Sequence, residues 1–292
     1  MLGVRYRVVS VPPCVVDPGA LADVDVVFNL VESPPGRPGT QVEAAAAFEG
    51  LGLGLTGSSS GIIAATTDKE GTRRTLVRSG IGVAPGGLME LSDPSILEIV
   101  PPPWILKPAL EDASLGLDDG AVTSDRSAAI GFARRLEQRF PGQPILVEHL
   151  LPGREFNISL LADGSGVEVL PPAEMAFVDF PADEPRIVGW KAKWDETSFA
   201  YRHTVRRFPS RDGDGLVHAV EDVARLAWTA CGLAGYARVD LRLDEQDVPC
   251  VLEVNANPCL SPDAGFAAAA ATAGLDPPDV VGRILTAAGW TP

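Results

Sequence analysis

Two short polar motifs near the C-terminal end of the sequence carry side chains suited to phosphate and metal chemistry. Arg238-Val-Asp240 and Glu253-Val-Asn255 lie on two apolar, strand-like runs, and the acidic stretch 244–247 between them is typical of a hairpin turn. Side chains alternate between the two faces of a strand, so the two charged residues of the first motif share a face. The two polar residues of the second motif do the same. A register symmetric about the turn places Asp240 opposite Glu253 or one diagonal step away.

Such a hairpin gathers two carboxylates, one amide oxygen and one guanidinium on a single surface. Mg²⁺ prefers a few carboxylates supplemented by phosphate oxygens and water, so this set of ligands predicts a Mg²⁺ site that carries a polyphosphate. The alternative is an ordinary hairpin with a solvated charged face, because antiparallel sheets often expose one polar face.

Composition excludes several classes of protein. The 292 residues are 46% hydrophobic, which is enough for a large buried core in one or two compact units. A formal net charge of −15 repels nucleic acids and anionic membranes, so neither is an expected partner. The sequence has no signal-like N-terminal segment and no apolar run of membrane-spanning length, which predicts a cytoplasmic location.

The cysteines and histidines do not form a catalytic pattern. Cys14, Cys231, Cys250 and Cys259 show no CxxC spacing and no grouping with histidine, so free thiols in a reducing compartment are expected. None of the three histidines pairs with a nucleophile at useful spacing. A serine–histidine or cysteine–histidine hydrolase is therefore disfavoured.

Strand, helix and loop signals alternate along the chain and predict an α/β fold. Apolar runs predict strands at 24–30, 104–107, 145–148 and 154–161. Apolar periodicity, caps and stop signals predict helices at 40–49, 69–79, 125–139, 216–231, 266–273 and 280–288. The first of these helices is expected to open with a capping box, Thr40 to Glu43, and the second with Asp68 as its cap. The stretch 85–103 is rich in loop residues and is predicted to be a boundary between lobes.

Two lysines and one bend add to the candidate phosphate site. Lys107 ends an apolar strand, and Lys69 lies near a helix N-terminus, a region that favours phosphate. Either lysine could equally be a surface charge. Glu148 and Glu155 flank an apolar bend, 150–153, that could hold a flat base, with one acid accepting from an amine and the other binding ribose hydroxyls. A plain turn between strands is the alternative.

Five segments in this order carry a family resemblance: Asp68-Lys69, 105–108, 146–156, 238–240 and 253–258. Upstream, 28–30, 39–40 and 55–58 fit the same pattern. Together they resemble the D-alanine–D-alanine ligase branch of the ATP-grasp superfamily, over most of 24–275. The resemblance implies an α/β fold with α+β lobes of the ATP-grasp type. Its lobes would be a shortened N-terminal lobe at 1–66, a central lobe at 67–147 and a C-terminal lobe at 148–292.

The resemblance also implies how ATP would be bound. Lys69 and Lys107 would hold its phosphates. Glu148, together with backbone groups from His149 to Leu151, would bind adenine, and Glu155 would bind the ribose. Two Mg²⁺ ions, replaceable by Mn²⁺, would be held by Asp240, Glu253 and Asn255.

Three further residues receive catalytic roles by resemblance. Arg238 would stabilise charge on the transferred phosphoryl group and then on the tetrahedral intermediate. Lys193 resembles the mobile-loop lysine that reaches the γ-phosphate. Ser114 is the hydroxyl that remains in register in the phosphate-covering loop after Lys107, where Asp112 and Ala113 replace the usual glycine and serine.

The substrate-binding positions depart from the family pattern. Glu32 and Arg37 stand where the family has a histidine and an acid, and they could bind the ammonium and carboxylate of an amino acid or form a solvated pair. Ala264 falls where the family has a serine for the acceptor carboxylate, although Ser261 is close. Small amino-acid-like substrates other than two D-alanines are therefore expected. The resemblance also raises the expectation of a homodimer.

Three classes of function remain open. The favoured class is a ligase that joins a carboxylate to an amine through an acyl phosphate. An ATP-grasp enzyme that closes a ring within one molecule needs no separate amine, so product mass distinguishes it. A non-catalytic nucleotide-binding protein is disfavoured because Lys107, Arg238, Asp240, Glu253 and Asn255 are all present.

Overall fold

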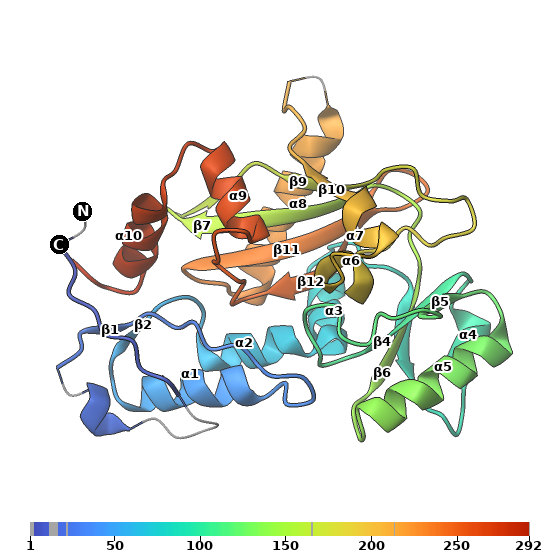
Figure 1. The fold of residues 1–292 in the computed structure, drawn as a ribbon, viewed down its shortest axis with the longest axis horizontal. Helices are drawn as coiled ribbons and strands as arrows, with labels where there is room; N and C mark the ends of the chain where they lie inside the picture. Colours follow the sequence, from blue (N-terminus) through green and yellow to red (C-terminus); the bar gives the residue numbers. More distant parts are fainter. Residues whose placement is uncertain (1–2, 12–16, 22, 165, 213, 292) are drawn as a thin grey trace.

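Two antiparallel sheets, each packed against helices, position the polar motifs (Figure 1). The structure is a computed structural model that describes residues 3–11, 17–21, 23–164, 166–212 and 214–291. Cys14, expected to be a free thiol, lies outside the described residues, whereas Cys231, Cys250 and Cys259 are free. Within the described ranges, no helix is both long and apolar enough to cross a membrane.

The larger sheet has six strands and contains the predicted hairpin. Its order is β10-β9-β7-β11-β12, with β8 paired to β7. The strands are β7 (Glu155–Ala162), β8 (Val167–Val169), β9 (Ala173–Phe177), β10 (Thr204–Arg207), β11 (Tyr236–Leu243) and β12 (Pro249–Asn255). Asp240 pairs directly with Glu253, and Arg238 pairs with Asn255, so the predicted hairpin register is confirmed.

Helices cover both faces of the six-stranded sheet. Alternate apolar residues of β7 and β11, such as Ile158 and Val239, face α8 (Gly215–Cys231). The other face carries the polar motifs and packs partly under α9 (Gly265–Thr272) and α10 (Pro277–Ala287). α8 ends at Gly232, whose φ of 66° is the left-handed conformation that the predicted glycine stop permits.

The smaller sheet has four strands in the order β3-β6-β4-β5. The strands are β3 (Gly86–Met89), β4 (Trp104–Pro108), β5 (Val122–Thr123) and β6 (Ile145–His149), and α4 (Ile96–Ile99) and α5 (Arg126–Arg139) belong to the same unit. The stretch 85–103, predicted to be rich in loops and a boundary between lobes, also contains β3 and α4. The boundary between lobes stays a prediction. A β-carbon on Gly86 would lie 2.5 Å from the Val147 carbonyl oxygen, so glycine allows β3 to approach β6.

The N-terminal segment contributes helices and two very short strands. These elements are η1 (Pro18–Leu21), β1 (Val26–Val27), α1 (Thr40–Gly50), β2 (Gly54–Leu55), α2 (Ser60–Thr67) and α3 (Lys69–Arg78). The predicted strand at 24–30 shrinks to two residues because its parallel partner β2 offers only two. The predicted capping box is absent: Gly39 is the N-cap, and the Thr40 hydroxyl donates to the Arg37 carbonyl. Asp68 caps α3 as predicted, accepting from two backbone N–H groups.

Two five-residue helices, α6 (Trp190–Trp194) and α7 (Phe199–His203), lie between the two larger sheets in Figure 1. The predicted lobe boundaries at 66/67 and 147/148 fall inside α2 and β6. The division into three lobes therefore stays a prediction.

Candidate active site

Alternation along β11 places three charged residues on one face of the larger sheet. Arg238 forms a two-pronged ion pair with Asp240, with nitrogen–oxygen distances of 2.7 and 2.9 Å. Arg242, on the same face, lies 3.3 Å from a carboxylate oxygen of Glu155 in the neighbouring strand β7. Burial raises the pKa of the Glu155 carboxyl, and Arg242 opposes that shift. Arg242 was missed from the sequence, although its spacing of two residues from Asp240 signalled it.

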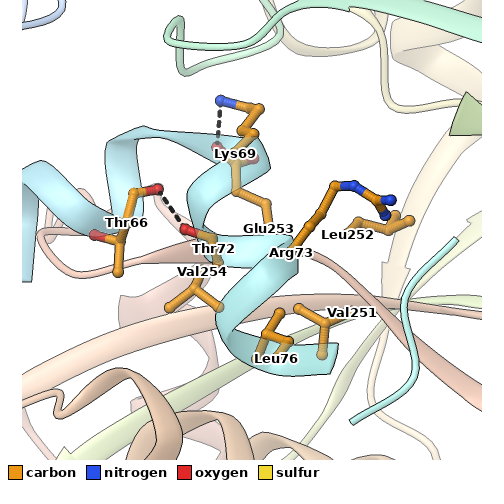
Figure 2. A pocket seen from close by; sticks show the side chains of 9 residues that line it. All are labelled: Thr66, Lys69, Thr72, Arg73, Leu76, Val251, Leu252, Glu253 and Val254. Atoms are coloured by element: carbon orange, nitrogen blue, oxygen red, sulfur yellow. Dashed lines mark hydrogen bonds and ion pairs between the residues drawn. The ribbon is translucent and has the colours of Figure 1, made fainter. Parts of the chain in front are cut away.

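Lys69 joins the hairpin to the phosphate-covering loop. Its ammonium lies 3.2 Å from Glu253 and 3.4 Å from Asp112, and it donates to the Glu111 carbonyl. Figure 2 shows the Lys69 side chain reaching from the first turn of α3 to Glu253 of β12, beside a pocket that both residues line. Burial opposes the charge on Lys69, but Glu253 and Asp112 outweigh it and raise the pKa of the ammonium.

The two carboxyl groups beside Lys69 are shifted in opposite directions. Burial raises the pKa of Glu253, but Lys69, Lys193 and other cations outweigh burial and hold the pKa of this carboxyl well below its usual range. For Asp112, burial dominates over Lys69, and its pKa rises to about 6. Asp112 also accepts from the Gln41 side-chain amide at 3.3 Å.

Lys107 and Glu148, predicted to act separately, form a buried ion pair. The Lys107 ammonium is 2.7 Å from Glu148, and the Arg73 guanidinium is 3.6 Å from the other oxygen of the same carboxylate. Lys107 and Glu148 both lie in the smaller sheet, on the paired strands β4 and β6. The Glu148 side chain is 2% exposed, and its second oxygen, Oε1, has no hydrogen-bond partner among the described residues. The adenine contact of Glu148 stays a prediction.

The bend at 150–153 has backbone geometry that suits a flat base. The amides of His149 and Leu150 donate to the carbonyls of Pro85 and Pro103, both at 2.8 Å. In the described part of the chain, no acceptor is assigned to the Leu151 amide, which leaves one donor at the bend. A β-carbon on Gly153 would lie 2.5 Å from the Leu243 carbonyl oxygen, so the bend needs glycine to pack on β11.

Lys193, on α6, faces the charges of the larger sheet. Burial, and then the positive charge of Arg238, lower the pKa of its ammonium. The opposing carboxylates are those of Glu253, Asp240 and Glu155. The structure therefore brings the predicted mobile-loop lysine to the predicted metal and ribose ligands.

The segment that carries Lys193 is docked on the phosphate-covering loop. The Ser114 hydroxyl donates to the Val188 carbonyl at 2.7 Å, and the Trp194 indole N–H donates to the Ala113 carbonyl at 3.0 Å. Ala113 and Ser114 both have positive φ, near 60°, so the loop turns sharply where these contacts are made. The hydroxyl of Ser114 thus holds this segment, and a direct catalytic contact by Ser114 stays a prediction.

The predicted substrate residues lie at the edge of this group. Glu32 and Arg37 are exposed, and the backbone amide of Gly36 between them donates to the Glu111 carboxylate at 3.2 Å. The negative charge of Glu32 acts on the Tyr236 hydroxyl, which places Glu32 near the start of β11. Ser261 is exposed, and its hydroxyl oxygen accepts from the Cys259 thiol at 3.2 Å.

The structure thus gathers the predicted phosphate, ribose and metal residues from both larger sheets. Sequence reasoning missed the contributions of Gln41, Arg73, Asp112 and Arg242, since it assigned none of them a role. Among the described residues, no cluster of three or more His, Cys, Asp or Glu side chains is arranged as a metal site. A divalent ion here would also need the amide oxygen of Asn255.

Comparison with known proteins identifies the family. Residues 92–286 match the family model described as the D-ala D-ala ligase C-terminus. The chain belongs to the D-alanine–D-alanine ligase family. The D-alanine–D-alanine ligase of Gluconobacter oxydans is 30% identical over 259 residues, covering 88% of this chain and 78% of that enzyme. The uncharacterized protein y4sG of Sinorhizobium fredii is 31% identical over 264 residues, covering 90% of this chain and 74% of its own.

Solved structures agree on the fold of this family member. The D-alanine–D-alanine ligase of Bacillus anthracis complexed with ATP has a TM-score of 0.72 at 19% identity, covering 93% of this chain and 81% of that chain. The D-alanine–D-alanine ligase of Coxiella burnetii has a TM-score of 0.69 at 17% identity, covering 90% of this chain and 67% of that chain. The predicted α/β fold of the ATP-grasp type is confirmed, and so is the class of enzyme, an ATP-dependent ligase that forms C–N bonds.

Proposed function

We propose that this D-alanine–D-alanine ligase relative joins the carboxylate of one small amino-acid-like substrate to the amine of another through an acyl phosphate. The supporting observation is one group of opposed charges: Lys69, Lys193 and Arg238 surround the carboxylates of Asp240 and Glu253. Several cations around a buried anionic centre suit a triphosphate that transfers its terminal group.

The donor set is compatible with Mg²⁺. Asp240 and Glu253 are directly opposite on β11 and β12, and Asn255 lies one alternate position further along the same face. Two carboxylates and one amide oxygen leave room for phosphate oxygens and water, as this ion prefers. When bound, Mg²⁺ would neutralise phosphate charge during transfer.

The protein's own cations would position the nucleotide. Lys69 and Lys107 are each already paired with a carboxylate, so phosphate binding would compete with Glu253 and Glu148 for their ammonium groups. Arg238, fixed by two bonds to Asp240, presents its remaining guanidinium donors to the transferring group. The free Leu151 amide N–H would donate a hydrogen bond to the base, and the Glu155 carboxylate would accept hydrogen bonds from the ribose hydroxyls.

The proposed chemistry has two steps. A substrate carboxylate oxygen attacks the γ-phosphorus, the bond from phosphorus to the ADP oxygen breaks, and ADP leaves. The amine nitrogen of the second substrate then attacks the acyl carbon, the carbon–oxygen bond to phosphate breaks, and the amine proton leaves with inorganic phosphate. Arg238 and Lys193 stabilise the negative charge that develops in both steps.

The substrates are proposed to be small amino-acid-like molecules, with D-alanine as one candidate among others. Ala264 lacks the hydroxyl group expected at the position for the acceptor carboxylate, which supports altered specificity. Homodimer formation likewise stays a prediction.

The proposal is tested by ADP release with ATP and Mg²⁺ over a panel of amino acids and amines, followed by product mass. A product whose mass equals two substrates minus water supports the ligase. Loss of water from a single substrate would instead indicate ring closure. Nucleotide binding without turnover on any substrate would contradict catalysis. D-Alanine as by far the best substrate would contradict altered specificity alone.

A further inference from the structure

Arg206 lies on the same face of the larger sheet as the catalytic charges. It pairs with Met175 across β10 and β9, Met175 pairs with Glu155 across β9 and β7, and Glu155 pairs with Arg242 of β11. Directly paired residues of an antiparallel sheet share a face. Arg206 therefore shares the face of Arg242, and so that of Arg238, whereas Arg207 points to the opposite face.

Arg206 has no ion-pair partner among the described residues, whereas Arg238 and Arg242 on the same face are each paired with a carboxylate. The arginines with a carboxylate oxygen within 4 Å include Arg154, Arg211, Arg238, Arg242 and Arg283. Asp263 acts on Arg206 only at longer range. Burial, and then the positive charge of Arg238, lower the pKa of the Arg206 guanidinium. Two guanidinium groups thus lie close enough to repel each other, and only Arg238 is neutralised.

The beginning of α9 lies beside the Arg206 guanidinium. Gly265 begins α9, and a β-carbon there would lie 3.7 Å from a terminal nitrogen of Arg206 and 3.9 Å from its central carbon. Arg206 is exposed on its remaining side, so a small anion can reach it from solvent.

We infer that Arg206 binds the free carboxylate of the amino-acid-like substrate that supplies the amine, and so restricts the enzyme to acceptors that carry such a carboxylate. The inference rests on the proposed function. A guanidinium binds a carboxylate through two parallel hydrogen bonds, and the bound anion would relieve the repulsion between Arg206 and Arg238. The γ-phosphate of ATP has the same oxyanion chemistry, and the experiment separates the two.

The test measures binding to the full chain by calorimetry. Nucleotide binding is measured first, with Mg²⁺ and the non-hydrolysable analogue AMP-PNP. The nucleotide-bound protein is then titrated with the twenty proteinogenic amino acids and D-alanine, each compared with its own carboxamide. At least one acid should bind the unsubstituted protein at least tenfold more tightly than its carboxamide. In Arg206→Gln the difference should fall to within twofold, with nucleotide affinity unchanged.

Two variants control for loss of charge and for structural effects. Arg207→Gln removes the same charge from the opposite face and should keep the acid preference. Asp263→Asn should keep or strengthen acid binding, because it removes a competing carboxylate. Equal losses in Arg206→Gln and Asp263→Asn would mean that the two residues only hold each other, and would overturn the inference.

Failure of the inference can be told apart from failure of the proposed function. Absence of nucleotide binding would overturn the proposed function. Nucleotide binding with no acid preferred over its carboxamide would overturn the inference alone. A loss of AMP-PNP affinity in Arg206→Gln would assign Arg206 to phosphate, which also overturns it.

Discussion

At Glu253, Asp112 and Lys69, burial and ion pairing shift the pKa in opposite directions. Burial favours the neutral carboxyl at both Glu253 and Asp112, but Glu253 has several cations near it. At Asp112, burial outweighs the positive charge of Lys69, and the negative charge of Glu253 adds to the effect of burial. The two carboxyl groups therefore titrate far apart because their neighbours differ.

Asp112→Asn should stabilise the protein in a pH-dependent way. The pKa of Asp112 is about 6 in the folded chain and 3.8 in the unfolded chain. Ionisation of this carboxyl therefore destabilises the folded state relative to the unfolded state. That cost is absent below about pH 4, where the carboxyl is protonated in both states, grows between pH 4 and pH 6, and is complete above pH 6. The melting temperature of the variant minus that of the parent should follow the same course in thermal unfolding scans.

Asp222→Asn, at an exposed position of α8, serves as the control for a lost charge. The difference in melting temperature between Asp222→Asn and the parent should vary little with pH. If the gain in melting temperature of Asp112→Asn became smaller as the pH rises, the assigned direction of the pKa shift would be contradicted.

Lys107→Met should destabilise the chain because it leaves the Glu148 carboxylate buried with only Arg73, at 3.6 Å, as a cation. Breaking a buried ion pair from one side costs about 3–5 kcal/mol. The double variant Lys107→Met with Glu148→Gln should recover part of this loss in urea unfolding, because the buried charge is gone. Both variants lack the Lys107 ammonium, so both should bind nucleotide more weakly than the parent protein. Equal stability of the single and double variants would argue against the pair.

At the scale of elements, the α6 segment is held on the phosphate-covering loop by a few polar contacts. Besides the bonds made by Ser114 and Trp194, the Trp190 amide donates to the Leu117 carbonyl at 3.0 Å, and Lys191 lies 2.6 Å from Asp119. α6 has no buried residue, so little apolar area adds to these bonds. A segment held in this way opens more readily than the sheets that flank it.

Trp194→Phe should raise the fraction of molecules in which the α6 segment is open. The melting temperature should stay almost unchanged. The variant loses one hydrogen bond, to the Ala113 carbonyl, worth about 1 kcal/mol, or roughly a fivefold change in the open population. Limited trypsin digestion at Lys191 and Lys193 reports that population. Trp228→Phe on α8 is the matched control. A cleavage rate in Trp194→Phe equal to that of the control would contradict docking through the indole.

At the scale of the whole molecule, Tyr236 connects segments from both ends of the chain. Its buried hydroxyl donates to the Asn257 side chain at 2.8 Å and lies 3.3 Å from the Asn29 carbonyl oxygen. The Asn257 side-chain amide donates in turn to the Val31 carbonyl at 3.0 Å. The loop that carries Glu32 is thereby anchored beside the end of β12.

Tyr236→Phe should lower the melting temperature by about 2–4 °C. One lost buried hydrogen bond costs about 1 kcal/mol, and a chain of this size converts that into such a shift. Tyr201→Phe is the control, because that side chain is exposed and its hydroxyl has no assigned partner within the described ranges. A shift in Tyr236→Phe no larger than that of the control would argue against the connection.

Local signals in the amino-acid order account for the hairpin, its shared polar face, the Asp68 cap and the Gly232 stop, because alternation, caps and turns act over a few residues. Contacts between segments that are far apart in the sequence determined the other features. β3 exists because β6 pairs with it across Gly86, Lys69 meets Glu253 across most of the chain, and Arg206 reaches the charged face through four paired strands. Such contacts depend on which strands become neighbours, and spacing within a single segment carries no record of that choice.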